Sequence, residues 1–245
     1  MENPFNLSDE KLKELLNAYF DWSNKSEVDR DYPIKEKRKS GKWEKILLNK
    51  EYLQEISDIE LVKLIIEYSR ELEWPANIKI GESKVLSELE KLKRNLLYII
   101  ESTDDPFFIA GKILEGDFQI PVFSKAFWSP LFRAKFPELL PNWNNKTDNF
   151  LRKLGVNVTT SKKTIEEKYK VFSNSYKYLK SLDERYDFYY LDHLTHFGTV
   201  IPEGIRLIDD LQFDFNEWVN LEEIQELIKD YAEIRNRKDP ELWQE

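Results

Sequence analysis

Apolar residues recur at three- and four-residue spacing along most of the chain, a pattern that predicts helices. The first helix follows Ser8, whose hydroxyl suits an N-cap, and its predicted inner face holds Leu12, Leu15, Leu16, Tyr19 and Phe20. Ser57 and Glu60 have the spacing of a capping box, in which each side chain bonds the other residue's backbone amide. We therefore expect a second helix to begin at Ser57 and to end before Pro75.

The rest of the chain follows the same pattern. We expect a long helix over residues 85–102, a helix start at Asp105-Pro106, and helices near 124–136, 145–154, 162–182, 188–197 and 221–236. Residues 25–45 are charged and contain Pro33 and Gly41, so they are interpreted as a loop or irregular arm. Apolar runs with strand character are too short to build a sheet. The predicted fold class is all-α, a compact multi-helix bundle.

Composition narrows the class of protein. The chain has 245 residues, 41% of them apolar, which is enough for a packed core, and it has no cysteine for a disulfide or a thiolate metal site. No run approaches the length of a transmembrane helix, and the acidic start does not resemble a signal peptide, so a cytoplasmic location is expected. No cofactor is expected.

Charge is distributed unevenly along the chain. The net charge is −9, yet residues 181–245 carry −11 and residues 1–180 carry +2. One basic run, with Trp43 available to stack on a base, is a candidate DNA-backbone contact and contains Lys35, Lys37, Arg38, Lys39 and Lys42. A second candidate cluster contains Arg133, Lys135, Lys146, Arg152 and Lys153. The alternative for the first run is a solvated lysine-rich loop.

The stretch 120–155 contains two predicted helices and a turn, IPVFSKAFWSPLFRAKFPELLPNWNNKTDNFLRKLG. Asn144 or Asn145 suits the N-cap of the second helix, and Gly155 suits its C-terminal end. A well-capped core helix explains these residues without any function.

The same stretch resembles the catalytic core of helix-hairpin-helix DNA glycosylases. In that family a Leu-Pro-Gly-Val-Gly-x-Lys hairpin precedes a helix capped by aspartate; here Lys125 follows Ile120-Pro121-Val122-Phe123-Ser124, and Asn144 lies nineteen residues further on. The resemblance covers about residues 85–200, where a late segment, Tyr190 to Gly198, is also similar to some archaeal members. It implies a glycosylase-like helical fold and contact with DNA.

Two departures from the family pattern argue against its chemistry. Asparagine at position 144 carries no charge to stabilise a cationic sugar, and the hairpin glycines that admit a phosphate are absent. We therefore expect no catalytic residues, and these departures favour binding without catalysis over an enzyme. An active glycosylase or lyase using Lys125, with Asp148 or Asp192 as its carboxylate, is the alternative.

The stretch is also similar to N-terminal helical domains of Mcr-type modification-dependent restriction systems. The shared features are Lys125-Ala-Phe127, Phe136-Pro137, Lys146-Thr147 and Leu154-Gly155. This resemblance implies recognition of a modified base in a restriction or defence system, with a fused or separate NTPase or nuclease subunit as partner. The chain itself lacks a Gly-x-x-x-x-Gly-Lys-Ser/Thr loop.

Aromatic and amide side chains near this turn are candidates for a base pocket. They are Lys125, Trp128, Trp143, Asn144 and Asn145, with Tyr189 and Tyr190 as further candidate walls. Trp143 lies in a predicted turn and is expected to be exposed. His193 and His196 lie on one helical face beside Asp192, but no further ligand is evident, so structural histidines are expected and no metal site.

These observations predict three regions: residues 1–84 with the basic arm at about 25–50, a glycosylase-like core at 85–200, and an acidic C-terminal helix at 201–245 that packs on the body. The predicted function is a non-catalytic DNA-binding domain that recognises a modified or flipped base. Besides the glycosylase, an acidic protein-interaction module that does not bind DNA is an alternative, motivated by the charge of residues 181–245.

Overall fold

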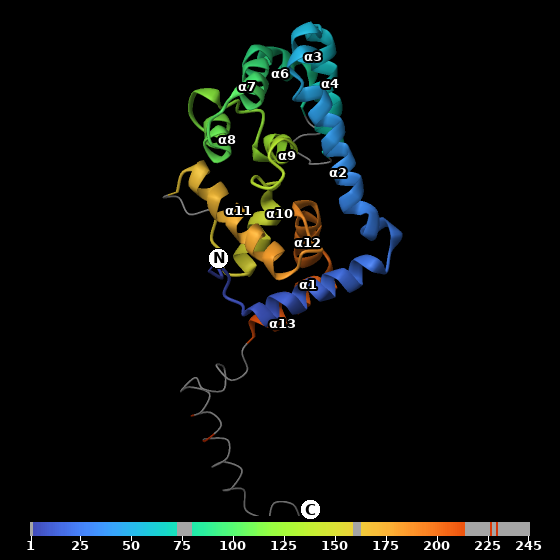
Figure 1. Cartoon of the computed structure of the whole chain (residues 1–245), viewed down its shortest axis with the longest axis vertical. Helices are drawn as coiled ribbons and strands as arrows, with labels where there is room; N and C mark the ends of the chain where they lie inside the picture. The colour runs from blue at the N-terminus through green and yellow to red at the C-terminus, as the bar shows by residue number, and fades with distance from the viewer. Residues whose placement is uncertain (1, 73–79, 159–162, 214–225, 227–228, 230–245) are drawn as a thin grey trace, which may run out of the picture. The chain divides into compact units, whose positions relative to one another are not determined.

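The computed structural model describes residues 2–72, 80–158, 163–213, 226 and 229. All regular secondary structure in these residues is helical, as predicted (Figure 1). The helices are α1 (Asp9–Asn24), α2 (Glu27–Leu47), α3 (Lys50–Glu55), α4 (Asp58–Glu71), α6 (Glu82–Ser87), α7 (Leu89–Glu101), α8 (Pro106–Leu114), the 3-10 turn η1 (Gly116–Phe118), α9 (Lys125–Lys135), α10 (Asn145–Lys153), α11 (Ile165–Leu182), α12 (Phe188–Val200) and α13 (Pro202–Gln212).

The predicted helix starts are confirmed where a capping residue marks them. Ser8 accepts a hydrogen bond from the amide of Lys11, and Ser57 and Glu60 form the expected capping box. Asp105 caps α8, with Pro106 in its first turn. Local side-chain chemistry therefore determines where these helices begin.

The prediction of a loop at residues 25–45 is wrong, because α2 is a 21-residue helix that contains Pro33. Its buried side chains are Pro33, Ser40, Trp43 and Leu47, which lie at helical spacing on one face. Since only part of this face is apolar, hydrophobic periodicity does not reveal it. Gly41 is tolerated in α2, where a Cβ would meet no atom within 4 Å.

Two other helix boundaries differ from the sequence expectation. The predicted helix at 85–102 is two helices, α6 and α7, which meet at Glu88. The helix α13 was not predicted, because its start at Pro202 follows α12 closely. The predicted helix at 221–236 lies outside the described residues, apart from residues 226 and 229.

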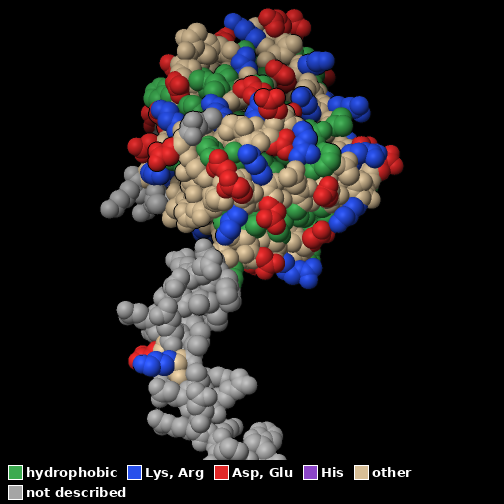
Figure 2. All heavy atoms as spheres, turned by 60° about the horizontal axis from the view of Figure 1, so that its bottom comes forward, with side chains coloured by type: hydrophobic (Ala, Val, Ile, Leu, Met, Phe, Trp, Pro, Cys, Tyr) green, Lys and Arg blue, Asp and Glu red, His purple; other side chains and the backbone are tan. Residues whose placement is uncertain are grey.

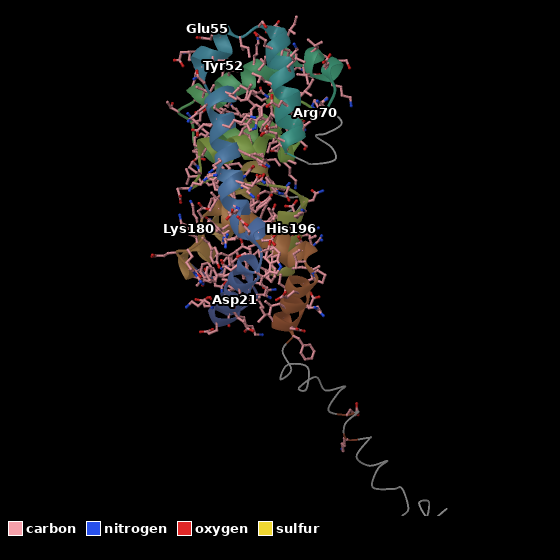
Figure 3. The ribbon with its side chains drawn as sticks, turned by 90° about the vertical axis from the view of Figure 1, so that its right-hand side faces the viewer. Asp21, Tyr52, Glu55, Arg70, Lys180 and His196 are labelled. Atoms are coloured by element: carbon pink, nitrogen blue, oxygen red, sulfur yellow. The ribbon has the colours of Figure 1, made fainter. Side chains whose placement is uncertain are left out.

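The long helix α2 runs lengthwise along one side of the first unit and packs against α9 and α12 (Figures 1 and 3). In the view of Figure 3 it extends from the neighbourhood of Asp21 toward Tyr52 and Glu55. Helix α10 packs on α12, and α11 packs on α8. Segments far apart in sequence are thereby brought to the inner face of α2.

The chain divides into two compact units, Met1–Ile208 and Asp209–Glu245. The second unit is described only at residues 209–213, 226 and 229. The subdivision at residues 85 and 201 stays a prediction. None of the described helices is long and apolar enough to cross a bilayer.

Candidate functional site

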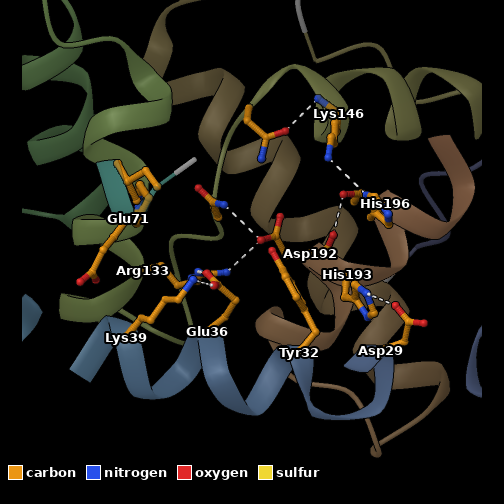
Figure 4. A pocket seen from close by; sticks show the side chains of 15 residues that line it. Asp29, Tyr32, Glu36, Lys39, Glu71, Arg133, Lys146, Asp192, His193 and His196 are labelled. Carbon is orange, nitrogen blue, oxygen red and sulfur yellow. Dashed lines mark hydrogen bonds and ion pairs between the residues drawn. The ribbon is translucent and has the colours of Figure 1, made fainter. Parts of the chain in front are cut away.

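A polar cavity of about 290 Å³ lies where α2, α4, α9, α10 and α12 meet (Figure 4). In Figure 4 the α2 side chain of Tyr32 points toward Asp192 of α12, and that of Glu36 points toward Arg133 of α9. The lining side chains are Asp29, Tyr32, Glu36, Lys39, Glu71, Leu72, Pro130, Arg133, Asn142, Asn144, Lys146, Asp192, His193, Thr195 and His196. Nearly all of them are polar, and they come from segments spread over most of the first unit.

Asn144 both caps α10 and lines the cavity. Its Oδ1 accepts hydrogen bonds from the backbone amides of Lys146 at 2.8 Å and Thr147 at 3.2 Å. Thr147 Oγ1 accepts from the Asn144 amide at 3.0 Å and completes a capping box. The predicted N-cap is thus confirmed, and Nδ2 of Asn144, whose side chain lines the cavity, makes no hydrogen bond to any described residue.

A buried ion pair forms the floor of the cavity. Arg133 is 2% exposed, and its Nη1 donates to Asp192 Oδ2 at 3.2 Å. Asn142 Nδ2 donates to the same oxygen at 3.1 Å, and Arg133 stacks on the Tyr189 ring at 4.1 Å. Burial raises the pKa of Asp192, and the Arg133 guanidinium and the hydrogen bond from Asn142 offset part of this rise.

The two histidines of α12 line the cavity as neutral rings. Burial lowers the pKa of His193 to about 4, and its Nδ1 lies 3.1 Å from the Tyr19 hydroxyl. Burial and the neighbouring Lys146 ammonium lower the pKa of His196. Lys146 Nζ lies 3.3 Å from His196 Nδ1, and since an ammonium can only donate, this nitrogen accepts. Tyr32 stacks on His193 with ring centroids 4.6 Å apart.

No set of three or more His, Asp or Glu side chains in the described part of the chain is arranged to hold a metal ion. His193 instead makes its contacts with Tyr19, Tyr32 and Asp29, the last at 3.7 Å. The groups that a ligand would meet in the cavity are thus mainly hydrogen-bonding side chains and charged side chains.

Lys125 does not line this cavity. Its ammonium pairs with Asp148, which also accepts a hydrogen bond from Trp143 Nε1 at 2.6 Å. The ammonium lies 4.8 Å from the centre of the Trp143 ring. The expectation that Trp143 is exposed is wrong: it is 2% exposed, because it packs edge-on against Tyr169 at 4.7 Å.

The other residues predicted to form a base pocket lie in different parts of the structure. Trp128 is fully buried in the aromatic core, between Phe127 and Phe132. Asn145, the first residue of α10, is exposed. Of the five predicted base-pocket residues, only Asn144 lines the cavity.

The basic residues of α2 fall into two groups. Ion pairs hold Lys37 to Asp187, Lys39 to Glu36, Lys42 to Glu67 and Glu71, and, just beyond the helix, Lys50 to Glu101. Lys35, Arg38 and Lys45 are exposed and have no ion pair with any described residue. Trp43 is 3% exposed and donates to Glu71 at 2.7 Å, so its ring offers no free face to a base.

A second hollow connects the basic residues of α2 with the cavity. It is lined by Lys35, Arg38, Lys39, Lys42 and Glu71. Lys39 and Glu71 also line the polar cavity, so the two hollows are adjacent. We call Lys35, Arg38, Lys39 and Lys42 the basic stripe.

The second predicted basic cluster is dispersed. Arg133 is buried in its ion pair, and Lys146 lines the cavity beside His196. Arg152 is exposed and donates to Asn149 at 2.8 Å, while Lys135 and Lys153 are half-buried. On the face drawn in Figure 2, acidic and basic side chains intermingle rather than separate into patches.

The chain was compared with family models, curated proteins and solved structures. None of them matches. The glycosylase-like fold therefore stays a prediction, and the site rests on its own geometry.

Sequence reasoning missed most of the cavity. Tyr32, Glu36 and Glu71 line the cavity, yet no sequence pattern assigned a functional role to any of them. Asn142 and Asp192 are 50 residues apart in sequence and meet only through the packing of α12 beside the 142–144 turn. The sequence singled out seven of the lining residues for separate reasons, but not their meeting in one cavity: Lys39, Arg133, Asn144, Lys146, Asp192, His193 and His196.

Proposed function

We propose that this protein binds DNA and holds one unpaired base in the polar cavity without cleaving it. The observation that carries the proposal is the adjacency of the basic stripe and the cavity, because the hollow lined by the stripe shares Lys39 and Glu71 with the cavity. Lysine and arginine on one helix can follow a phosphate backbone, and a cavity beside them can receive a base turned out of the helix. The function needs no motor or metal.

Three features support this proposal. Lys35 and Arg38 are exposed and not held by ion pairs with described residues, so they can meet phosphates without breaking a contact. A cavity of about 290 Å³ is at the lower end of the range of small-ligand sites. Residues 1–208 carry a net charge of only −1, since most of the negative charge lies in residues 209–245.

The glycosylase-like arrangement of residues 85–200 belongs to the same proposal. Lys125 is the first residue of α9 and Asn144 caps α10, which is the order of elements that the resemblance implies. A role as the recognition part of a restriction or defence system is consistent with binding a base without cutting it. The Asn144 side chain can form hydrogen bonds with a base, but it has no charge to stabilise a cationic sugar.

The experiment that tests DNA binding is a fluorescence-anisotropy titration of a labelled duplex with one unpaired nucleotide, repeated over a range of salt concentrations. We expect binding at about 50 mM salt that weakens steeply as salt rises. The double variant Lys35→Gln/Arg38→Gln is expected to reduce the slope of log K against log salt by about 2.

The matched control is Lys13→Gln/Lys84→Gln. These two exposed lysines lie on α1 and α6, line neither hollow, and change the net charge by the same amount. The control should leave the slope unchanged. Absence of binding at about 50 mM salt, or equal slopes in both double variants, would overturn the proposal.

Lys125 and Asp148 support a second candidate, a glycosylase or lyase, because the structure brings the amine and a carboxylate together. The amine would have to lose its proton to attack a sugar. Borohydride trapping on duplexes with damaged bases tests this candidate. A covalent adduct that disappears in Lys125→Ala is the expected result for a lyase, and no adduct on any lesion excludes a Schiff-base mechanism.

A further inference from the structure

The cavity is lined by more negatively charged side chains, which accept hydrogen bonds, than positively charged ones. Four carboxylates line it, from Asp29, Glu36, Glu71 and Asp192, against three cations, from Lys39, Arg133 and Lys146. Its two histidines are neutral at pH 7, since burial lowers the pKa of both. A negatively charged ligand is therefore disfavoured, and a neutral ligand that donates hydrogen bonds is favoured.

Two side chains in the cavity, one with an acceptor and one with a donor that no described residue occupies, remain for a ligand. Asp192 Oδ2 already accepts from Arg133 and Asn142, whereas Oδ1 accepts no hydrogen bond from any described residue. Asn144 is 3% exposed; its Oδ1 is used by the α10 amides, and its Nδ2 donors have no described partner. The cavity thus offers one carboxylate acceptor and one amide donor.

We propose that the cavity selects a base with an exocyclic amino group beside an unprotonated ring nitrogen, as in cytosine and adenine. The amino group donates to Asp192 Oδ1, and the ring nitrogen accepts from Asn144 Nδ2. In protein–DNA recognition, carboxylates accept a hydrogen bond from the cytosine amino group, and Asn or Gln amides form paired hydrogen bonds with adenine. This inference rests on the proposed DNA binding and specifies its ligand.

Uracil and hypoxanthine are the informative comparisons. Each differs from its amino counterpart by one replacement, in which a keto oxygen takes the place of the amino group and the ring nitrogen gains a proton. Both hydrogen-bonding positions are then reversed, so a carboxylate would face a keto oxygen. Buried groups left unpaired in this way discriminate strongly.

The test uses the full chain and five duplexes, identical except for one unpaired position that carries cytosine, uracil, adenine, hypoxanthine or an abasic sugar. Affinities are measured by anisotropy at one fixed salt concentration. Cytosine and adenine are expected to bind at least about tenfold more tightly than their keto counterparts and the abasic site. The variant Asn144→Asp is expected to abolish this preference, because it replaces the amide donor with an acceptor.

Asn144→Asp is chosen because aspartate is as good an N-cap as asparagine, so α10 should be retained. Asn145→Asp is the matched control: it adds the same charge at the next residue, which is exposed and does not line the cavity. It should keep the cytosine and adenine preference. Circular dichroism and thermal midpoints verify that both variants fold.

The outcomes separate this inference from the proposed function. Salt-dependent binding of equal strength to all five duplexes overturns the base preference and leaves DNA binding intact. A preference for the keto bases, or an amino preference that survives Asn144→Asp, also overturns the inference. Failure of every duplex to bind at about 50 mM salt overturns both.

Discussion

Asn144 serves the helix and the cavity with different atoms. Its Oδ1 satisfies two backbone amides at the start of α10, while Nδ2 is on the side chain that lines the cavity. Substitutions at this residue can therefore change stability and binding separately. Alanine removes both groups, whereas aspartate keeps the cap and removes the donor.

The cap predicts a stability difference between these two substitutions. Asn144→Ala should lower the free energy of unfolding by about 1 kcal/mol, because two helix amides lose their acceptor. Asn144→Asp should stay within a few tenths of a kcal/mol of the wild type. Urea denaturation measures both, and an alanine variant as stable as the wild type would contradict the capping role.

His193 predicts a loss of stability in mild acid. Its pKa in the folded chain is about 4, below the value of about 6.5 for an unfolded chain. The unfolded chain therefore binds more protons between these two values. This contribution is fully present above about pH 6.5 and declines as pH falls to about 4, by on the order of 1–3 kcal/mol.

The measurement is the free energy of unfolding at several pH values from 7 to about 4. In His193→Gln the decline should be smaller, because the titrating ring is gone and glutamine carries no proton to exchange. His193 contributes nothing of this kind if the variant and the wild type lose stability in parallel.

At the scale of elements, α2 carries both the basic stripe and one wall of the cavity. Its buried face holds it against α9 and α12, and its exposed face presents Lys35 and Arg38. A helix in this position keeps the stripe at a fixed place beside the cavity. A loop or irregular arm, which the sequence predicted, would not.

Gly41 provides a test of the α2 helix. A Cβ at this position would meet no atom within 4 Å, and the residue lies in the helix interior. Gly41→Ala should therefore stabilise the protein by about 0.5–1 kcal/mol, since alanine loses less backbone entropy. Thermal or urea unfolding measures the change, and a loss of stability would contradict a helix here.

Gly198 of α12 is the contrasting position. A Cβ there would lie 2.8 Å from the Phe150 ring, so Gly198→Ala should destabilise the protein by about 1–3 kcal/mol through overpacking. The two alanine substitutions are expected to have opposite signs. Equal effects at both positions would show that helix propensity alone determines the outcome.

A helix could be predicted from the sequence where residues close to it in the chain determine where it begins. Capping residues such as Ser57, Asp105 and Asn144 act within one turn, and all three helix starts were predictable. Helix α2 was not, because proline and glycine indicate a break while burial against α9 and α12 stabilises the helix. The burial of Trp143 likewise depends on Tyr169, a residue distant in sequence.

At the scale of the whole molecule, the cavity assembles residues from Asp29 to His196. Its floor depends on contacts such as that between Arg133 and Asp192, 59 residues apart in sequence. No local pattern encodes such a pair, so the sequence pointed to Asn144, the basic stripe, Arg133 and Asp192 separately but not to their arrangement around one cavity. We propose that these parts form one site for a base.

The most direct test of that claim is an NMR titration that follows the side-chain amide of Asn144 in ¹⁵N-labelled protein, assigned by its loss in Asn144→Asp. Duplexes with one unpaired cytosine or one abasic sugar are added to the full chain. We predict that the Asn144 Nδ2 signals shift with the cytosine duplex and not with the abasic duplex. Binding of the cytosine duplex that leaves these signals in place would contradict the account.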